Sequence, residues 1–141
     1  MLIYLGIGTN LGDREANLRA ALRRLDARVG DQLACSSVYR SAPQGFVSEH
    51  EFANVVAIYR TDYSPEDVLL ITQEIEREMG RTQKSVNGIY HDRVIDIDLL
   101  QAIQDSIFLL RDSSNLQLPH PRMRERDFVM VPLQEVEQLL R

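Results

Sequence analysis

The sequence predicts an α+β fold, in which helices pack on an antiparallel sheet. Apolar and β-branched runs alternate with helical patterns in the order β-α-β-β-α-β. The second and third strands are joined by a loop without a helical pattern, so we expect them to be antiparallel. This is the ferredoxin-like split βαβ (βαββαβ) arrangement with a C-terminal extension. The 141 residues contain no internal repeat or linker, so we expect one domain over residues 1–141.

The chain begins with a strand at Leu2–Ile7, and its last two residues overlap a glycine-containing segment, Gly6–Asp13. The glycine spacing G-x-G-x-x-x-G is one residue too long for a dinucleotide-binding fingerprint. We interpret this segment as a tight turn, with Asp13 near the N-cap of a helix. Gly30 is expected to end that helix. The helix is predicted by apolar residues at helical spacing: Leu18, Ala21, Leu22, Leu25 and Val29.

Two further strands are predicted at Gln32–Arg40 and Phe52–Arg60, joined by a polar loop from Ser41 to Glu51. One face of the later strand carries Phe52, Asn54, Val56 and Ile58. A buried amide such as Asn54 needs partners for its donor and acceptor atoms, and the edge of a flat heterocycle would supply them. A capped or solvated strand end is the alternative interpretation.

The second helix has a strong start signal at Ser64-Pro65-Glu66-Asp67, with an N-cap serine, proline at the first position and an acidic first turn. Gln73 and Glu76 fall off its apolar face and need not be core residues. Gly80 is expected to end it. The following polar connection, Arg81–Asp92, is 12 residues long, and loops of this length are usually functional lids or mobile. The apolar face comprises Val68, Ile71, Ile75 and Met79.

A pair of aspartates interrupts the apolar strand predicted at Arg93–Leu100. Because side chains alternate along a strand, Asp96 and Asp98 share one face, and their backbone positions are about 6.6 Å apart. Two carboxylates this close repel each other and lose hydration, so we expect a cation between them. Mg²⁺ fits best, since it takes oxygen ligands from one or two carboxylates and from substrate phosphates. The alternative is an edge strand whose polar face is simply hydrated.

The last third of the chain predicts short strands at Ile107–Leu110 and Leu116–Leu118, around a turn at Asp112–Asn115. The rigid segment Pro119-His120-Pro121 follows. We expect Pro132 to open a final helix.

Composition narrows the class of function. With 44% hydrophobic and 26% charged residues, and no apolar run near the roughly 20 residues of a membrane span, the chain is typical of soluble globular proteins and no membrane partner is expected. The formal net charge of −5 argues against a nucleic-acid partner. A single cysteine, Cys35, and a Met1–Leu5 segment without basic residues predict a cytoplasmic protein. Our working prediction is a monomer.

Basic residues near the aspartates and near the C-terminus suit a small anionic ligand such as a nucleotide: Arg81, Lys84, Arg93, Arg122, Arg124 and Arg126.

Eight short motifs occur in a characteristic order: Gly8–Gly12, Tyr39–Pro43, Phe52–Asn54, Gln73–Glu76, Gly80-Arg81, Arg93–Asp98, Leu118–Pro121 and Arg126–Phe128. Together they resemble the 6-hydroxymethyl-7,8-dihydropterin pyrophosphokinases of folate biosynthesis, from Leu2 to about Val136. The resemblance implies transfer of the pyrophosphoryl group of ATP to the hydroxymethyl oxygen of the pterin, with release of AMP. It also implies two Mg²⁺ ions, with ATP as co-substrate.

The same resemblance implies roles for individual residues. Asp96 and Asp98 would bind the metal ions, and Arg81 and Arg93 would clamp the phosphates during catalysis. His120 and Arg126 would contact the triphosphate. The residues implied on the nucleotide side are Gln73, Glu76, Arg81, Arg93, His120 and Arg126. The residues implied on the pterin side are Ala42, Pro43, Gln44, Phe52, Asn54, Tyr90 and Phe128, with Phe52 and Phe128 stacking on the ring.

Two other classes of function stay open on the sequence. One is another phosphoryl or nucleotidyl transferase that uses the same aspartate pair with two metal ions. It leaves Phe52, Asn54 and Phe128 without a use. The other is a ferredoxin-like ligand-binding module without catalysis, which explains neither the aspartates nor Arg81 and Arg93.

Overall fold

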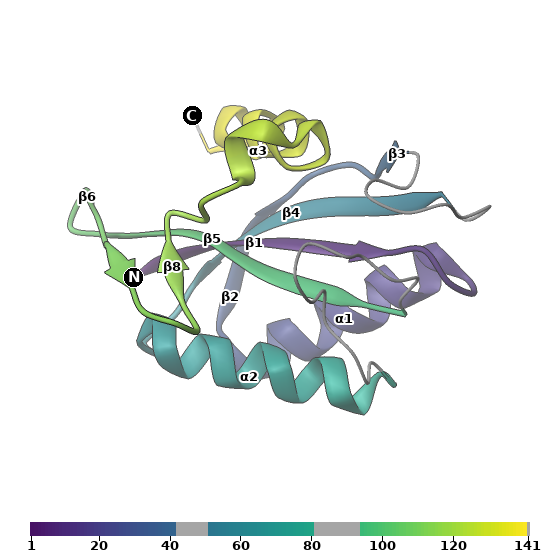
Figure 1. Cartoon of the computed structure of the whole chain (residues 1–141), viewed down its shortest axis with the longest axis horizontal. Coiled ribbons are helices and arrows are strands. Elements are labelled where there is room, and N and C mark those ends of the chain that lie inside the picture. Colours follow the sequence, from purple (N-terminus) through teal and green to yellow (C-terminus); the bar gives the residue numbers. More distant parts are fainter. Residues whose placement is uncertain (42–50, 81–93, 141) are drawn as a thin grey trace.

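The structure, a computed structural model, describes residues 1–41, 51–80 and 94–140 (Figure 1). Its helices are α1 (Arg14–Arg28), α2 (Pro65–Glu78) and α3 (Asp127–Leu139), with a short 3₁₀ turn η1 (Met123–Glu125) before α3. Its strands are β1 (Leu2–Thr9), β2 (Asp31–Cys35), β3 (Tyr39–Ser41), β4 (Phe52–Arg60), β5 (Asp96–Gln104), β6 (Ile107–Phe108), β7 (Arg111–Asp112) and β8 (Gln117–Leu118). None of the helices in these ranges is both long enough and apolar enough to cross a membrane.

The main sheet has the strand order β2-β4-β1-β5-β6, and every neighbouring pair is antiparallel. Strand β4 lies between β1 and β2, which are connected through α1. This insertion of a later strand between the two strands of a βαβ unit defines the split βαβ arrangement. The predicted ferredoxin-like fold class is therefore confirmed. Strand β3 pairs with the first residues of β4, and β7 pairs with β8 in a separate ribbon.

Helices cover both faces of the sheet (Figure 1). Helices α1 and α2 lie on one face, over a core that includes Ile3, Ala57 and Ile97. Helix α3 lies on the other face, and its Leu133 packs in a second core with Val56. Alternation along each strand assigns neighbouring residues to different cores, so the sheet has an α1/α2 face and an α3 face.

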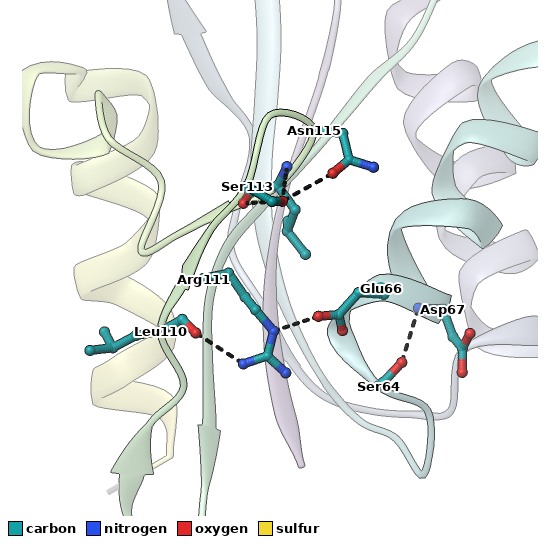
Figure 2. A network of polar contacts seen from close by, with 8 residues as sticks. Ser64, Glu66, Asp67, Leu110, Arg111, Ser113 and Asn115 are labelled. Atoms are coloured by element: carbon teal, nitrogen blue, oxygen red, sulfur yellow. Dashed lines mark hydrogen bonds and ion pairs between the residues drawn. The ribbon is translucent and has the colours of Figure 1, made fainter.

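Local signals begin the first two helices where they were predicted. The Asp13 carboxylate accepts a hydrogen bond from the Ala16 backbone N–H at 3.0 Å. The Ser64 hydroxyl accepts one from the Asp67 N–H at 3.1 Å (Figure 2). Gly80 follows α2 with φ +92°, a conformation that side chains rarely adopt. At the start of α1 and α2, each N-cap side chain satisfies a backbone donor that the first turn of a helix leaves without an intrahelical partner.

The single strand predicted at Gln32–Arg40 is wrong, because the structure divides it into β2 and β3. Cys35 pairs with Ala57, whereas Tyr39 pairs with Asn54. The three residues between Cys35 and Tyr39 therefore lie opposite only two residues of β4. Ser36 forms the break: its N–H donates to the Val56 carbonyl and its hydroxyl accepts from the Val56 N–H, both at 2.9 Å. A serine side chain thus replaces a ladder hydrogen bond and allows the bulge.

The C-terminal extension also differs from the prediction. Ile107 and Phe108 fold back on β5 because Asp105 and Ser106 both adopt positive φ, at 53° and 64°. That is the backbone of a tight two-residue hairpin. The segment that pairs with Gln117–Leu118 is instead Arg111–Asp112. Arg111 also donates a hydrogen bond to Glu66 in the first turn of α2, which ties the extension to the main domain (Figure 2).

Pro132 does not open the last helix, which begins five residues earlier. The N–H groups of Val129 and Met130 both donate to the Arg126 carbonyl, at 3.0 and 2.9 Å, and these bonds form the first turn of α3. A proline inside a helix removes one backbone donor. Pro132 is buried within α3, as is the neighbouring Leu133.

Candidate active site

The aspartate pair lies at the start of β5. Ile95, Ile97 and Leu99 are buried in the α1/α2 core, so Asp96 and Asp98 lie on the α3 face, and both are half-buried. The shared face predicted for the two carboxylates is confirmed. The strand itself begins at Asp96, after Val94 and Ile95, and it extends to Gln104.

Strand β1 lies beside the aspartates and presents glycine to them. Gly8 pairs with Asp96 on one side and with Asn54 of β4 on the other, while Gly6 pairs with Asp98 and Val56. Gly6 lies in the first strand, as predicted, but the interpretation of the segment as a tight turn is wrong for Gly8, because β1 continues to Thr9. The alternation of glycines at the period of a strand was the signal for this arrangement in the sequence.

Asn54 is only 7% exposed on the α3 face. Its amide nitrogen, Nδ2, has no hydrogen-bond partner within the described parts of the chain. A buried amide donor without a partner is costly, so this nitrogen is a candidate donor to a ligand acceptor. The face shared with Phe52 follows from strand alternation, and Phe52 is half-buried at the first position of β4.

His120 is brought to the aspartates by its backbone. Its N–H donates to the carbonyl of Leu100, two residues after Asp98, at 2.7 Å. The Arg122 N–H donates to Nδ1 of the imidazole at 3.2 Å, so in the neutral ring the proton is on Nε2. Burial lowers the pKa of His120 below its ordinary value, and the positive charge of Arg126 lowers it further, against the opposing effect of Asp96. His120 therefore offers an Nε2–H donor from a neutral imidazole.

Arg126 and Phe128 are adjacent at the start of α3. The Arg126 guanidinium lies over the Phe128 ring, 5.5 Å from its centroid, which is a cation–π geometry. Phe128 is half-buried and packs against the α3-side core. The structure thus places a candidate phosphate ligand and a candidate stacking ring side by side, on the sheet face that also carries Asp96 and Asn54.

Glu76 occupies an unexpected position. Its place off the apolar face of the helix meant that it need not be a core residue, but it is 2% exposed, and its Oε2 accepts a hydrogen bond from the Ile97 backbone N–H at 2.8 Å. Ile97 lies between Asp96 and Asp98, so α2 contacts the backbone that carries the aspartate pair. Gln73 is half-buried on the same helix. Their predicted roles toward the nucleotide stay predictions.

Several predicted site residues lie outside the described residues. These are Ala42, Pro43, Gln44, Arg81, Tyr90 and Arg93, and Lys84 lies there as well. Their roles stay predictions.

The donor set fits Mg²⁺. Within residues 1–41, 51–80 and 94–140, no group of three or more His, Cys, Asp or Glu side chains could hold a metal ion. Two carboxylates are what Mg²⁺ commonly takes from a protein when substrate phosphates complete its coordination. Asp96 and Asp98 therefore suit an ion that arrives with a nucleotide.

Comparisons with known proteins are consistent with this geometry. The family model of the 7,8-dihydro-6-hydroxymethylpterin-pyrophosphokinases matches residues 4–138. A 2-amino-4-hydroxy-6-hydroxymethyldihydropteridine pyrophosphokinase of Porphyromonas gingivalis is 51% identical over 135 residues, which is 96% of this chain and 90% of that protein. The enzyme of the same name from Bacillus subtilis is 36% identical over 136 residues, covering 96% and 77% of the two chains.

A solved structure described as HPPK-DHPS in complex with substrates has the same fold. Its TM-score is 0.65 at 14% identity, and the match covers 96% of this chain and 40% of that one. At this identity the likeness concerns the fold alone.

Proposed function

This chain belongs to the 7,8-dihydro-6-hydroxymethylpterin-pyrophosphokinase family, and we propose that the residues around Asp96 and Asn54 form the active site of that enzyme. The reaction transfers the pyrophosphoryl group of ATP to the hydroxymethyl oxygen of 6-hydroxymethyl-7,8-dihydropterin, in folate biosynthesis. The hydroxyl oxygen bonds to the β-phosphorus and loses its proton. The bond from that phosphorus to the α–β bridging oxygen breaks, and AMP leaves with the electron pair.

The observation that carries this assignment is the row Asn54, Gly8 and Asp96, which crosses three adjacent strands. At one end of the row is a buried amide suited to the edge of a heterocycle. At the other end is a carboxylate pair suited to a metal–phosphate complex. A reaction between a pterin and a triphosphate requires these two kinds of binding group on one surface.

On the nucleotide side, Asp96 and Asp98 would hold Mg²⁺, and their spacing supports a site for two ions. When bound, the metal would neutralise the charge of the phosphates and polarise the attacking hydroxyl oxygen. Arg126 would bind phosphate oxygens through its guanidinium fork, as would Arg81 and Arg93. His120, held as the Nε2–H tautomer, would donate a hydrogen bond to a phosphate oxygen without adding a charge.

On the pterin side, Asn54 would bond to the ring edge, while Phe52 and Phe128 would stack on its faces. Burial of Asn54 and its amide nitrogen without a described partner support this assignment. Ala42, Pro43, Gln44 and Tyr90 are proposed for the same subsite by resemblance. Gln73 and Glu76 are proposed for the nucleotide side on the same ground.

We further infer a monomeric protein of one domain that acts in the cytoplasm. The single cysteine supports the reducing compartment.

One assay tests the function. The protein is incubated with Mg²⁺, ATP and 6-hydroxymethyl-7,8-dihydropterin, and the nucleotide product is identified by chromatography. AMP is expected, formed only when the pterin is present. ADP would indicate a different phosphoryl transferase, and absence of any nucleotide product would indicate a binding module.

A further inference from the structure

We propose that Gly8 is a positioning residue for the pterin, because only a residue without a side chain lets the Asn54 amide lie against the central strand beside Asp96. The inference rests on the proposed function, which assigns the pterin edge to Asn54. It adds a reason why the pterin subsite and the phosphate subsite are one strand apart.

The register of the sheet places Gly8 between the two subsites. Gly8 pairs with Asn54 of β4 and with Asp96 of β5, and all three are on the α3 face. Adjacent strands are about 4.8 Å apart, so the backbones of Asn54 and Asp96 are separated by about 10 Å. A side chain at position 8 would stand between them, over the strand that separates the two proposed subsites.

The Asn54 side chain already uses that space. A Cβ atom added at Gly8 would lie 2.4 Å from Oδ1 of Asn54, closer than real Cβ contacts allow. Oδ1 therefore lies directly over the glycine. The same amide is 7% exposed, and its Nδ2 has no hydrogen-bond partner among the described residues. The contact with Gly8 thus sets the orientation in which this buried N–H donor is offered to a ligand.

The neighbouring glycine on the same face behaves differently. The three atoms nearest to a Cβ at Gly6 would all be side-chain atoms of Leu100, the nearest at 3.4 Å, which is ordinary van der Waals distance. Gly6→Ala therefore makes the same chemical change, on the same strand and face, without touching Asn54. It is a matched control for the effect of alanine at position 8.

Gly8→Ala should fold, because the atom that must move is the end of a side chain rather than backbone. Asn54 rotates to admit the new methyl group, and its amide leaves the pterin edge. The expected signature is a selective loss: pterin binding weakens while nucleotide binding and thermal stability are kept. A merely structural role for Gly8 would instead lower the melting temperature and weaken both ligands together.

The experiment measures dissociation constants by calorimetry for 6-hydroxymethylpterin, which is already oxidised and stable, and for a non-hydrolysable ATP analogue with Mg²⁺. The proteins are the unmodified chain, Gly8→Ala, Gly6→Ala, Asn54→Ala and the double variant Gly8→Ala/Asn54→Ala. We expect Gly8→Ala to weaken pterin binding at least tenfold and analogue binding less than twofold. Gly6→Ala should bind the pterin within twofold of the unmodified chain. In the Asn54→Ala background, Gly8→Ala should add less than a twofold loss, because both changes act through one amide.

Three results would overturn the inference: unchanged pterin affinity in Gly8→Ala, an equal loss for Gly6→Ala, or losses that multiply in the double variant. If Gly8→Ala does not fold, the Asn54→Ala variant decides. Undiminished pterin binding in that variant would show that the Asn54 amide does not bind the pterin, so Gly8 could not position it. Failure of the proposed function is distinguishable, because the unmodified chain itself would then bind no pterin.

Discussion

Replacing Glu76 with alanine should loosen the strand that carries the aspartate pair. The Glu76 carboxylate accepts the Ile97 N–H at 2.8 Å in a site that is 2% exposed. Strand β6 pairs only with Ile103 and Gln104, at the end of β5. Within the described sheet, the outer edge of β5 near Ile97 is therefore bonded by α2 rather than by a strand. Glu76 thus acts on Asp96 and Asp98 through the backbone between them.

The size of the effect follows from that contact. Removing the acceptor leaves the buried Ile97 N–H without its hydrogen bond, which costs about 1–3 kcal/mol. We therefore expect Glu76→Ala to lower the free energy of unfolding by about 1–3 kcal/mol. For a chain of this size that corresponds to a fall in melting temperature of up to roughly 10 °C. Because partners outside the metal's own ligands typically change metal affinity 10–100-fold, the Mg²⁺ concentration for half-maximal activity should rise about tenfold.

Thermal unfolding and a Mg²⁺ titration of AMP formation measure the two effects separately. Glu74→Ala is the matched control, because Glu74 is exposed on the same helix. Glu76→Gln retains an acceptor oxygen at the same position and should recover more than half of both losses. The reasoning is refuted if Glu76→Ala matches Glu74→Ala in melting temperature and in Mg²⁺ midpoint.

Other predictions concern three further side chains. Asp98→Ala should abolish AMP formation at saturating Mg²⁺ while the circular dichroism spectrum is unchanged, and full activity would remove the metal-binding role. Phe128→Ala should weaken pterin binding more than ATP binding, by about 1–3 kcal/mol for the lost ring contact, and equal losses for the two ligands by calorimetry would contradict stacking. Burial, together with the negative charges of Glu135 and Asp26, raises the pKa of Cys35 to about 11, so alkylation by iodoacetamide followed by mass spectrometry should be slow at pH 8 and accelerate up to about pH 11. Rapid labelling of the folded protein at pH 7 would show an activated thiol instead.

The main fold and the aspartate part of the site were predictable from the sequence, because they depend on residues close together along the chain. Alternation placed Asp96 and Asp98 on one face, and the caps at Asp13 and Ser64 began α1 and α2, as the structure confirms. These signals come from steric rules that act within a few residues. The break between β2 and β3 was not predictable in this way, since Ser36 forms it by bonding to Val56, 20 residues away.

The sequence by itself determined the core β-α-β-β-α-β order, the polar face of β5 and the family to which the chain is similar, because each of these is written in contiguous residues. Only the tertiary structure decided that Gly8 lies between Asn54 and Asp96, that His120 reaches the carbonyl of Leu100, and that Glu76 is buried under the aspartate strand. Each of these contacts joins segments far apart along the chain. Strand register and helix packing set such contacts, and local periodicity carries no information about either.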